Sequence, residues 1–429
     1  MKPSSTLEKT LRFVQKLIPK PLYRFGQPIY HYLLAVAGTT LYGNPSRKLV
    51  VIAVTGTKGK SSVVELVAEL LRASGKKVAS ASTIRFVVGE ERERNLYKMT
   101  IPGRFFLQKF LRRAVDSGCT HAVIELTSEG ALQYRHKGVA FDALIFTNLQ
   151  PEHLERHGGF EAYAAAKLSL AKHLEGSPKR PRIIVANTDD TYGQKFLDFP
   201  VEKRVAYSLR DAEPYTADDK SVRFTWRGVL FSVPLPGVFN LYNCLAALSF
   251  GEALGLKVDD MQRALEHTSV IPGRAERIEA GQPFAVVVDY AHTPDSLKAL
   301  YETYKNKRIV AVLGNTGGGR DTWKRPLMGA LADEYAALAI LTNEDPYDED
   351  PQKIITAMAA GFKKQTPKII LDRRAAIAAA LKEAKNVNDA VLITGKGTDP
   401  YLMGPRGTKQ VWSDASVARE ELEKLGYHL

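Results

Sequence analysis

The stretch of sequence that decides the fold runs Val54-Thr55-Gly56-Thr57-Lys58-Gly59-Lys60-Ser61-Ser62. The apolar run at residues 50–54 leads into it and predicts a buried strand, and apolar residues at helical spacing follow it from 62 to 73. A glycine turn between a strand and a helix points backbone N–H groups and the helix N-terminus at an anion. The stretch therefore predicts a phosphate loop, in which Lys60 reaches the β- and γ-phosphates of a nucleotide and Ser61 binds Mg²⁺.

The loop is a shortened variant of the usual pattern, which needs a glycine where this chain has Val54. The alternative is an ordinary glycine turn between a strand and a helix, but the strand–loop–helix context favours phosphate binding. The residues of the loop that we expect to contact a nucleotide are Gly56, Thr57, Lys58, Gly59, Lys60, Ser61 and Ser62.

Strand-like and helical runs alternate along the rest of the chain. Runs at 122–126, 143–147 and 183–186 alternate with helical runs at 160–174 and 240–254, which is typical of a mostly parallel sheet covered by helices. The chain restarts near Ile271-Pro272-Gly273, and a Rossmann-like set of strands follows at 285–289, 308–313, 337–341, 368–371 and 390–393. We predict an α/β protein with three parts: a basic and aromatic segment (1–48), a central phosphate-loop nucleotide-binding domain (49–271) and a C-terminal Rossmann-like domain (272–429).

The composition excludes several classes of protein. With 45% hydrophobic and 25% charged residues, the chain is not collagen-like, low-complexity or disordered as a whole. The two cysteines, Cys119 and Cys244, lie far apart, which argues against a disulfide framework and a zinc site and fits a reducing cytoplasm. The 60 basic and 47 acidic residues give a net charge of +13, which suits an anionic partner such as a nucleotide, a nucleic acid or a membrane surface.

The positive charge is concentrated in residues 1–48, where eight basic residues face Glu8 alone, a net charge of +7. Residues 25–46 then carry no charge but many aromatic side chains. Pro28, His31 and Gly38 interrupt this stretch, so it predicts neither a signal peptide nor a transmembrane helix. Two interpretations stay open: a segment that lies on a membrane surface, or a segment that packs on the rest of the protein.

Further motifs follow the phosphate loop. Glu125 stands in Ile-Glu-Leu-Thr-Ser, Asn148 stands in Phe-Thr-Asn-Leu ahead of His153 and His157, and Lys167 ends the run Tyr-Ala-Ala-Ala-Lys. Later motifs are Phe239-Asn240-x-x-Asn243, Pro272-Gly273-Arg274, Asp289-Tyr290-Ala291-His292-Thr293-Pro294 and Gly318-Gly319-Arg320-Asp321. In kind and order these motifs resemble those of the Mur ligases, most of all the MurE-type muramoyl-tripeptide synthetases, over residues 50–425.

The resemblance implies a site for ATP and Mg²⁺. The residues that match the family's catalytic machinery are Lys60, Glu125, Asn148, His153 and Lys167, and the last of these is carbamylated in the family. Mg²⁺ would be held by Ser61, Glu125, His153 and carbamylated Lys167. Beyond the loop, ATP would meet Asn240, Asn243, Arg274, Asp289 and His292.

The resemblance also implies two substrate sites. Thr100, Thr127, Gln133 and Arg135 match positions that contact the muramoyl side of the acceptor. Arg320 matches an arginine that holds the carboxylate of the incoming amino acid. The rest of the amino-acid pocket would comprise Glu344, Asp345, Tyr347, Gly395 and Asp399.

The chain departs from the MurE-type pattern in three places. Where those enzymes carry a uridine-binding domain, this chain has residues 1–48, which fits an acceptor that is linked to a lipid. Diaminopimelate-specific members have an arginine where this chain has Tyr347, and a tyrosine supplies no positive charge to a second carboxylate. The acidic residues around Tyr347 suit a cationic amino acid, or else they form an acidic loop that favours the dipole of the next helix. Asp399 keeps a negative charge on a side chain one methylene shorter.

We therefore expect an enzyme that forms an amide bond with ATP. An acceptor carboxylate attacks the γ-phosphate to give an acyl phosphate, and lysines, backbone donors and metal ions offset the repulsion between the two anions. The expected partners are a muramoyl-peptide precursor and an amino acid, in the cytoplasm or at the inner face of its membrane, and no nucleic acid. The alternatives are a related ligase that acts on a lipid-linked precursor or on folylpolyglutamate, and a nucleotide-binding scaffold without catalysis.

Overall fold

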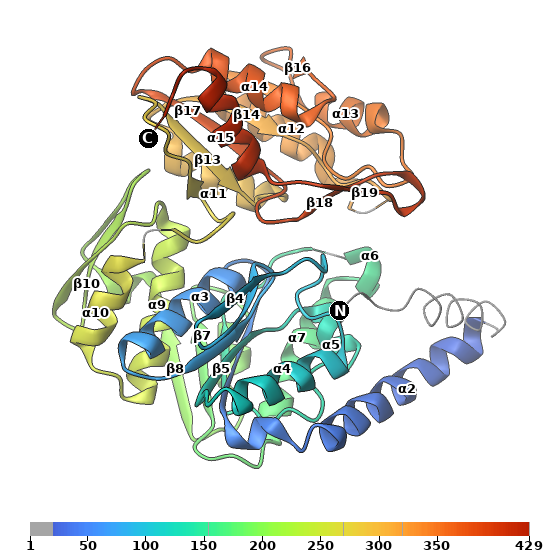
Figure 1. Ribbon diagram of the computed structural model, residues 1–429, viewed down its shortest axis with the longest axis vertical. Helices are drawn as coiled ribbons and strands as arrows, with labels where there is room; N and C mark the ends of the chain where they lie inside the picture. The colour runs from blue at the N-terminus through green and yellow to red at the C-terminus, as the bar shows by residue number, and fades with distance from the viewer. Residues whose placement is uncertain (1–19, 153, 269, 320, 429) are drawn as a thin grey trace.

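The computed structural model of the protein describes residues 20–152, 154–268, 270–319 and 321–428. Figure 1 shows two blocks that lie one above the other, each built on its own sheet. The chain passes from the first block, here called the central domain, to the second, the C-terminal domain, after α10 (Val258–His267). The arrangement confirms the predicted α/β class with two mostly parallel sheets.

The central domain is built on an eight-stranded sheet. Its order is β4 (Glu91–Arg94), β3 (Arg85–Val88), β2 (Val78–Ala81), β5 (His121–Glu125), β1 (Val50–Thr55), β6 (Ala143–Phe146), β7 (Ile183–Asn187) and β8 (Lys203–Tyr207). All neighbouring pairs are parallel except those that β3 makes with β2 and β4. The carboxyl ends of the parallel strands meet at one edge, so the segments after β1, β5 and β6 converge there.

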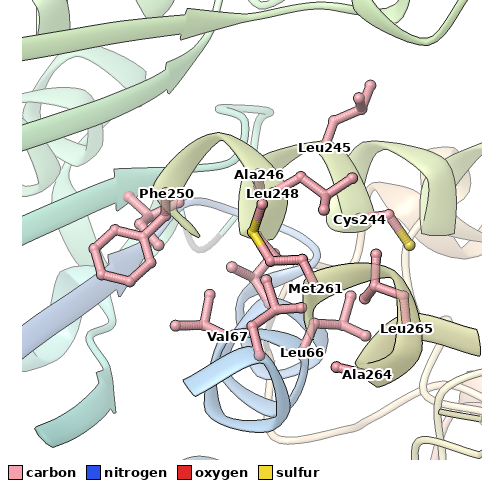
Figure 2. Packing of buried hydrophobic residues seen from close by; sticks show 14 of the residues in the cluster. Leu66, Val67, Cys244, Leu245, Ala246, Leu248, Phe250, Met261, Ala264 and Leu265 are labelled. Carbon is pink, nitrogen blue, oxygen red and sulfur yellow. The ribbon is translucent and has the colours of Figure 1, made fainter. Parts of the chain in front are cut away.

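Helices cover both faces of this sheet. Alternate residues of β1 point to opposite faces, so Ile52 and Val54 enter one core and Val51 and Ala53 enter the other. The first core contains α3 (Lys60–Ala73), α9 (Val238–Leu254) and α10; the second contains α4 (Arg104–Asp116), α5 (Ser128–Leu132), α7 (Phe160–Glu175) and α8 (Gly193–Leu197). Figure 2 shows Met261 of α10 between Leu248 of α9 and the pair Leu66 and Val67 of α3.

A small antiparallel sheet closes the first core. It comprises β9 (Tyr215–Ala217), β10 (Val222–Trp226) and β11 (Val229–Val233), and it follows the short 3-10 helix at Leu209–Ala212. Phe224, Trp226 and Phe231 are buried against α9 and α10. The sequence analysis did not predict this sheet.

The C-terminal domain is built on a six-stranded sheet in the order β12 (Glu276–Arg277), β13 (Ala285–Asp289), β17 (Asp389–Thr394), β14 (Arg308–Leu313), β15 (Leu338–Leu341) and β16 (Lys368–Ile369). Only β12 is antiparallel to its neighbour. One face carries α11 (Pro294–Tyr304), α12 (Lys324–Tyr335) and α13 (Pro351–Ala359), and the other carries α14 (Arg373–Glu383) and α15 (Asp414–Lys424). A hairpin of β18 (Tyr401–Met403) and β19 (Lys409–Val411) follows β17.

The described part of the N-terminal segment forms α2 (Lys20–Leu41) and a 3-10 turn at Pro45–Lys48. Its inner face packs on α4, where Ala35 and Thr39 are buried and Gln108 Nε2 donates to Thr39 Oγ1 over 3.0 Å. The outer face leaves five large apolar side chains exposed: Tyr30, Tyr32, Leu33, Val36 and Leu41. Residues 1–19 lie outside the described residues. No helix among the described residues is long and apolar enough to span a membrane.

Candidate active site

The phosphate loop joins β1 to α3, and two glycines decide its shape. Gly56 and Gly59 have φ angles of 146° and 82°, in the region that favours glycine. A Cβ atom on Gly56 would lie 1.9 Å from Thr147 Oγ1, and one on Gly59 would lie 2.4 Å from Asn243 Oδ1. The loop therefore lies directly against the segment after β6 and the first turns of α9, with no room for a side chain at either position.

Asn148 holds the loop from the end of β6. Its Oδ1 accepts a hydrogen bond from the Lys58 N–H over 2.8 Å, and its Nδ2 donates one to Lys58 O over 3.2 Å. Its main-chain carbonyl accepts another from the Thr57 N–H over 2.8 Å. These contacts fix the backbone of the loop, so the structure gives the Asn148 side chain a positioning role.

Two lysines bond to carbonyl groups of this loop. Lys60 Nζ donates to Thr57 O over 2.8 Å, and Lys167 Nζ, from α7, donates to Gly56 O over 2.5 Å. Lys60 reaches a cavity, whereas Lys167 is 1% exposed and packs 4.8 Å from the ring centroid of Tyr163. Desolvation lowers the pKa of both ammonium groups, that of Lys167 well below its usual value, and Lys60 lowers it further by repulsion.

Glu125 stands at the end of β5 beside the first turn of α3. Its Oε2 accepts hydrogen bonds from Ser61 Oγ (2.8 Å) and from the Thr83 N–H (2.9 Å), and its Oε1 accepts one from Thr83 Oγ1 (3.1 Å). A carboxylate and a hydroxyl are the oxygen donors that Mg²⁺ prefers, so Ser61 and Glu125 fit this ion. His153, the third predicted ligand, lies outside the described residues. Within them, no three His, Cys, Asp or Glu side chains gather into a metal site.

Glu152 connects the loop with the C-terminal domain. It is 6% exposed, and its Oε1 accepts a hydrogen bond from Lys58 Nζ over 3.0 Å and lies 2.9 Å from His292 Nε2. The other ring nitrogen of His292 lies 2.7 Å from Tyr290 O. Burial and the charge of Lys58 lower the pKa of His292 to about 4, although the hydrogen bond and the charge of Glu152 favour a protonated ring. Glu152 therefore links both domains at the edge of the loop.

A cavity of about 350 Å³ lies between the domains on one side of the loop. Arg274 NH2 donates to Ser61 Oγ over 3.3 Å, and its guanidinium lies 4.6 Å from the ring centroid of Tyr290. Asp289 accepts the N–H groups of Ala275 and Ala291 over 2.6 Å each, which shapes the hinge between the domains. The cavity has the size and lining of a nucleotide pocket. Among its lining residues are eight predicted ones: Lys58, Gly59, Ser62, Asn148, Asn243, Arg274, Asp289 and His292.

Asn240, which was predicted to contact ATP, is not among the residues that line this cavity and lies behind Asn243. Its Oδ1 accepts a hydrogen bond from Asn243 Nδ2 over 3.1 Å, and its Nδ2 donates one to Pro236 O over 2.8 Å. It is 1% exposed. In this structure Asn240 therefore orients Asn243, which faces the cavity.

A second cavity, of about 450 Å³, lies on the other side of the loop. Predicted residues that line it include Lys60, Ser61, Glu125, Thr100, Thr127 and Arg135. Thr127 Oγ1 accepts the Gly130 N–H over 3.1 Å and begins α5. Arg135 donates to Gln133 Oε1 over 2.8 Å and to Ile101 O. The two predicted acceptor residues Gln133 and Arg135 are thus in contact, and Gln133 holds the guanidinium.

A third cavity, of about 140 Å³, brings together the five described residues of the predicted amino-acid pocket, namely Glu344, Asp345, Tyr347, Gly395 and Asp399. Burial raises the pKa of Glu344. Its Oε1 accepts from Thr316 Oγ1 over 2.8 Å, whereas its Oε2 is buried without a hydrogen-bond partner among the described residues. A Cβ atom on Gly395 would lie 2.2 Å from that Oε2, so glycine leaves room for the carboxylate. Arg320 lies outside the described residues.

The other acidic residues near Tyr347 have structural partners. Asp348 accepts the N–H of Arg406, Glu349 pairs with Arg325 over 2.6 Å, and Asp350 accepts the Gln352 N–H at the start of α13. Asp350 stands at the start of α13, as the alternative interpretation of the acidic stretch expected, whereas Asp348 and Glu349 hold the loop. The contribution of this stretch to the cavity comes from Glu344 and Asp345.

Comparison with known proteins places this geometry in a family. The Mur ligase middle domain matches residues 54–251, and the Mur ligase glutamate ligase domain matches residues 273–397. The chain belongs to the Mur ligase family. It is 37% identical to a UDP-N-acetylmuramyl-tripeptide synthetase of Roseiflexus sp. (strain RS-1), over 96% of this chain and 85% of that one. It is 34% identical to a UDP-N-acetylmuramoyl-L-alanyl-D-glutamate--2,6-diaminopimelate ligase of Geobacillus kaustophilus (strain HTA426), over 92% of this chain and 83% of that one.

Solved structures agree with this assignment. A UDP-N-acetylmuramoyl-L-alanyl-D-glutamate--2,6-diaminopimelate ligase aligns with a TM-score of 0.59 at 31% identity, over 88% of this chain and 79% of that one. A Mycobacterium tuberculosis folylpolyglutamate synthase complexed with ADP aligns with a TM-score of 0.67 at 18% identity, over 85% and 92% of the two chains, which shows a shared fold. As a Mur ligase, the protein is an ATP-dependent ligase that uses Mg²⁺.

The structure also places residues in the site of this Mur ligase that the sequence analysis missed. Glu152 directly precedes His153, a predicted metal ligand, and Lys396 directly follows Gly395, a predicted residue of the amino-acid pocket. Both residues could therefore have been found from their neighbours in the sequence. Thr83, which holds Glu125, and Lys98, which enters the third cavity, lie in segments without a motif. Only the fold brings these two residues to the site.

Replacing Lys60 tests the phosphate loop. We expect Lys60→Ala to lower the rate of ATP hydrolysis at least about 100-fold, because it removes a positive charge that stabilises the negative charge on the phosphates in the transition state. Its melting temperature should stay close to that of the wild type, since the change also relieves repulsion of Lys167. Phosphate release and thermal melting measure the two effects, with the exposed Lys76→Ala as a matched control. A folded Lys60→Ala protein with near-normal hydrolysis would contradict the assignment of the loop.

Proposed function

We propose that this Mur ligase adds an amino acid to a muramoyl-peptide precursor through an acyl phosphate. The observation that carries the proposal is that Tyr290 and His292 line all three cavities. A nucleotide, an acceptor and an amino acid in the three cavities would therefore meet at one place. The curated relatives at 37% and 34% identity are named as a UDP-N-acetylmuramyl-tripeptide synthetase and as a UDP-N-acetylmuramoyl-L-alanyl-D-glutamate--2,6-diaminopimelate ligase.

The chemistry proceeds in two balanced steps. An oxygen of the acceptor carboxylate attacks the γ-phosphorus, the bond to the β-phosphate oxygen breaks, and ADP leaves. The amino group then attacks the acyl carbon, phosphate leaves, and a proton is released from the nitrogen. Lys60, Arg274 and the N–H groups of the loop offset the negative charge that gathers in the first step. We propose that Ser61, Glu125, His153 and Lys167 would hold Mg²⁺, which would supply further positive charge to offset that of the phosphates.

We propose that Lys167 acts as a carbamate. Carbamylation joins a neutral amine to carbon dioxide with release of a proton, and the strongly lowered pKa of Lys167 favours the neutral amine. As an ammonium group, Lys167 adds a cation beside Lys60 and Lys58. As a carbamate it becomes an anion with two oxygens, which suits both the neighbouring lysines and a divalent cation.

We propose that the added amino acid has a cationic side chain and is not meso-diaminopimelate. Tyr347 stands where diaminopimelate-specific relatives have an arginine for the second carboxylate. In the amino-acid cavity the carboxylate Glu344 is buried, and its Oε2 has no hydrogen-bond donor among the described residues. An ammonium group would supply that donor, whereas a second carboxylate of the substrate would be repelled.

We further propose that α2 brings the enzyme to an anionic membrane surface. Its outer face exposes Tyr30, Tyr32, Leu33, Val36 and Leu41 by 43% to 70%, and residues 1–48 carry a net charge of +7. Apolar and aromatic side chains enter the interface, and each nearby basic residue adds about 1 kcal/mol of attraction to anionic lipids. The inner face of α2 already packs on α4, so the helix reaches the membrane while it stays attached to the enzyme.

The substrate proposal is tested by amino-acid-dependent phosphate release. We expect lysine, with a muramoyl-dipeptide acceptor linked either to UDP or to a lipid, to give a kcat/KM at least about tenfold above that of meso-diaminopimelate. Tyr347→Arg should move the preference toward diaminopimelate, because it restores a charge for the second carboxylate, whereas the control Tyr347→Phe should not. A preference of the wild type for diaminopimelate would overturn the proposal.

Chemical rescue tests the carbamate. Lys167→Ala should lose most of its activity, since it removes the anionic group, and a small carboxylic acid such as formate should restore part of it. Lys172→Ala is the matched control, because Lys172 lies on the same helix and its side chain is 70% exposed. The carbamate is ruled out if Lys167→Ala keeps full activity without any additive.

Sedimentation with anionic phospholipid vesicles tests the membrane proposal. The full chain should sediment with the vesicles at low salt and less at high salt, because screening weakens the attraction. Leu33→Glu should weaken binding by placing a charge on the outer face of α2. Leu230→Glu should not, since Leu230 is 65% exposed on β11, outside the N-terminal segment. A wild-type chain that stays in the supernatant at low salt would show that α2 is a structural element only.

A further inference from the structure

Lys98 crosses from the central domain into the amino-acid cavity. Its Nζ lies 3.0 Å from Asp399 Oδ2 and also bonds to Asp345 Oδ2, both of the C-terminal domain. Its side chain is 17% exposed. Burial opposes the charge, but Asp399 and Asp345 outweigh it and raise the pKa of Lys98. Lys98 thus stays an ammonium group and ties the two domains together at the substrate.

The backbone of the segment after β4 holds Lys98 in position. Lys98 has a φ of 54°, a left-handed conformation that is unfavourable for a residue other than glycine. Asn95, which is 2% exposed, holds the turn: its Nδ2 donates to Ser82 O (2.9 Å) and Met99 O (3.0 Å), and its Oδ1 accepts the Tyr97 N–H (3.0 Å). The position of Lys98 is therefore fixed by its own domain.

A second residue of the same segment reaches the same loop of the C-terminal domain. Arg94 NH2 donates to Thr398 O over 3.1 Å and to Trp412 O over 3.4 Å. Thr398 directly precedes Asp399, so Arg94 and Lys98 contact neighbouring residues of the loop that follows β17. The segment at residues 94–98 thus makes a two-point contact across the domain boundary.

The segment also reaches the acceptor side of the site. Thr100 Oγ1 lies 2.9 Å from Thr83 Oγ1, and Thr83 donates to Glu125. Lys98 and Thr100 are two residues apart, and both line the second cavity. One short segment therefore connects the proposed metal ligand Glu125 with the wall of the amino-acid cavity.

Two lysines neutralise the charge of two of the three carboxylates that line the amino-acid cavity. Lys396 Nζ lies 2.9 Å from both oxygens of Asp345 and 3.0 Å from Asp399 Oδ2, which Lys98 also contacts. Glu344 is the third carboxylate of the cavity and pairs with neither of these lysines. Without Lys98 the domain boundary would lose two ion pairs, and Lys396 alone would face the three carboxylates of the cavity.

We propose that Lys98 is a latch that closes the amino-acid loop over the reacting centre and keeps water away from the acyl phosphate. The inference rests on the acyl-phosphate reaction proposed above. An opened boundary would let water attack the acyl carbon, which regenerates the carboxylate and releases phosphate without an amide. Lys98 is thus a positioning residue, which acts through Asp345 and Asp399 on the closure of the site.

The test compares two products of one reaction. Lys98→Met keeps the length of the side chain and removes its charge, so we expect amide formation to fall at least about tenfold while phosphate release falls less. The phosphate released per amide formed should rise from about one to two or more, because part of the acyl phosphate is hydrolysed. Lys98→Arg should restore much of the coupling, and Arg94→Gln should raise the ratio more weakly. Lys76→Met, at an exposed site of the same domain, should keep the wild-type ratio.

The outcomes separate the latch from the proposed reaction. A wild-type enzyme that forms no amide with any muramoyl acceptor would refute the reaction itself. A wild type that ligates normally, with a folded Lys98→Met protein that keeps a ratio of about one, would refute the latch alone. If Lys98→Met does not fold, Arg94→Gln decides, because an unchanged ratio there would also overturn the latch.

Discussion

The loop of residues 56–61 depends on a balance of charge that the rest of the structure maintains. Lys167 is buried and bonds to the Gly56 carbonyl of the loop, and Lys60 bonds to the Thr57 carbonyl from the cavity side. Lys58 extends from the loop and bonds to Glu152. As ammonium groups these lysines would repel one another, and desolvation adds to the cost of a charge on Lys60 and Lys167, which favours the neutral amine from which the proposed carbamate of Lys167 would form. Glu125 and Glu152 offset part of the repulsion, and the phosphates of a nucleotide would offset more. Bound anions therefore stabilise the loop, which suits a site where two anions are brought together.

This constraint explains why the site lies between two domains. The central sheet supplies the cations and Glu125, but the wall around the reacting atoms is completed by Arg274, Tyr290 and His292 from beyond the hinge. The pairs Glu152–His292 and Lys98–Asp399 join the domains on two sides of the same centre. Closure therefore does two things at once, since it completes the electrostatic environment and encloses the acyl phosphate.

Much of the fold follows from the sequence because parallel strands are continuous apolar runs. Residues 50–54 and 308–313 are such runs, and the structure forms β1 and β14 there. The antiparallel sheet at 215–233 was missed although residues 222–233 carry a hairpin pattern, with alternating apolar residues on both sides of an Arg227-Gly228 turn. Among site residues, the loop could be predicted from residue type and spacing, and Glu125 only from the resemblance to the Mur ligases. The role of Asn240 behind Asn243, and the entry of Lys98 from a segment without a motif, depend on tertiary contacts that no local pattern encodes.

The central claim is that these cations serve to join a substrate carboxylate to the γ-phosphate. The most direct measurement uses a muramoyl-dipeptide acceptor whose reacting carboxylate carries ¹⁸O at both oxygens, followed by mass analysis of the phosphate released during ligation. The account predicts that each phosphate contains one ¹⁸O atom, because the carboxylate oxygen that attacks phosphorus leaves with it. Phosphate that forms together with amide but contains no ¹⁸O would contradict the account.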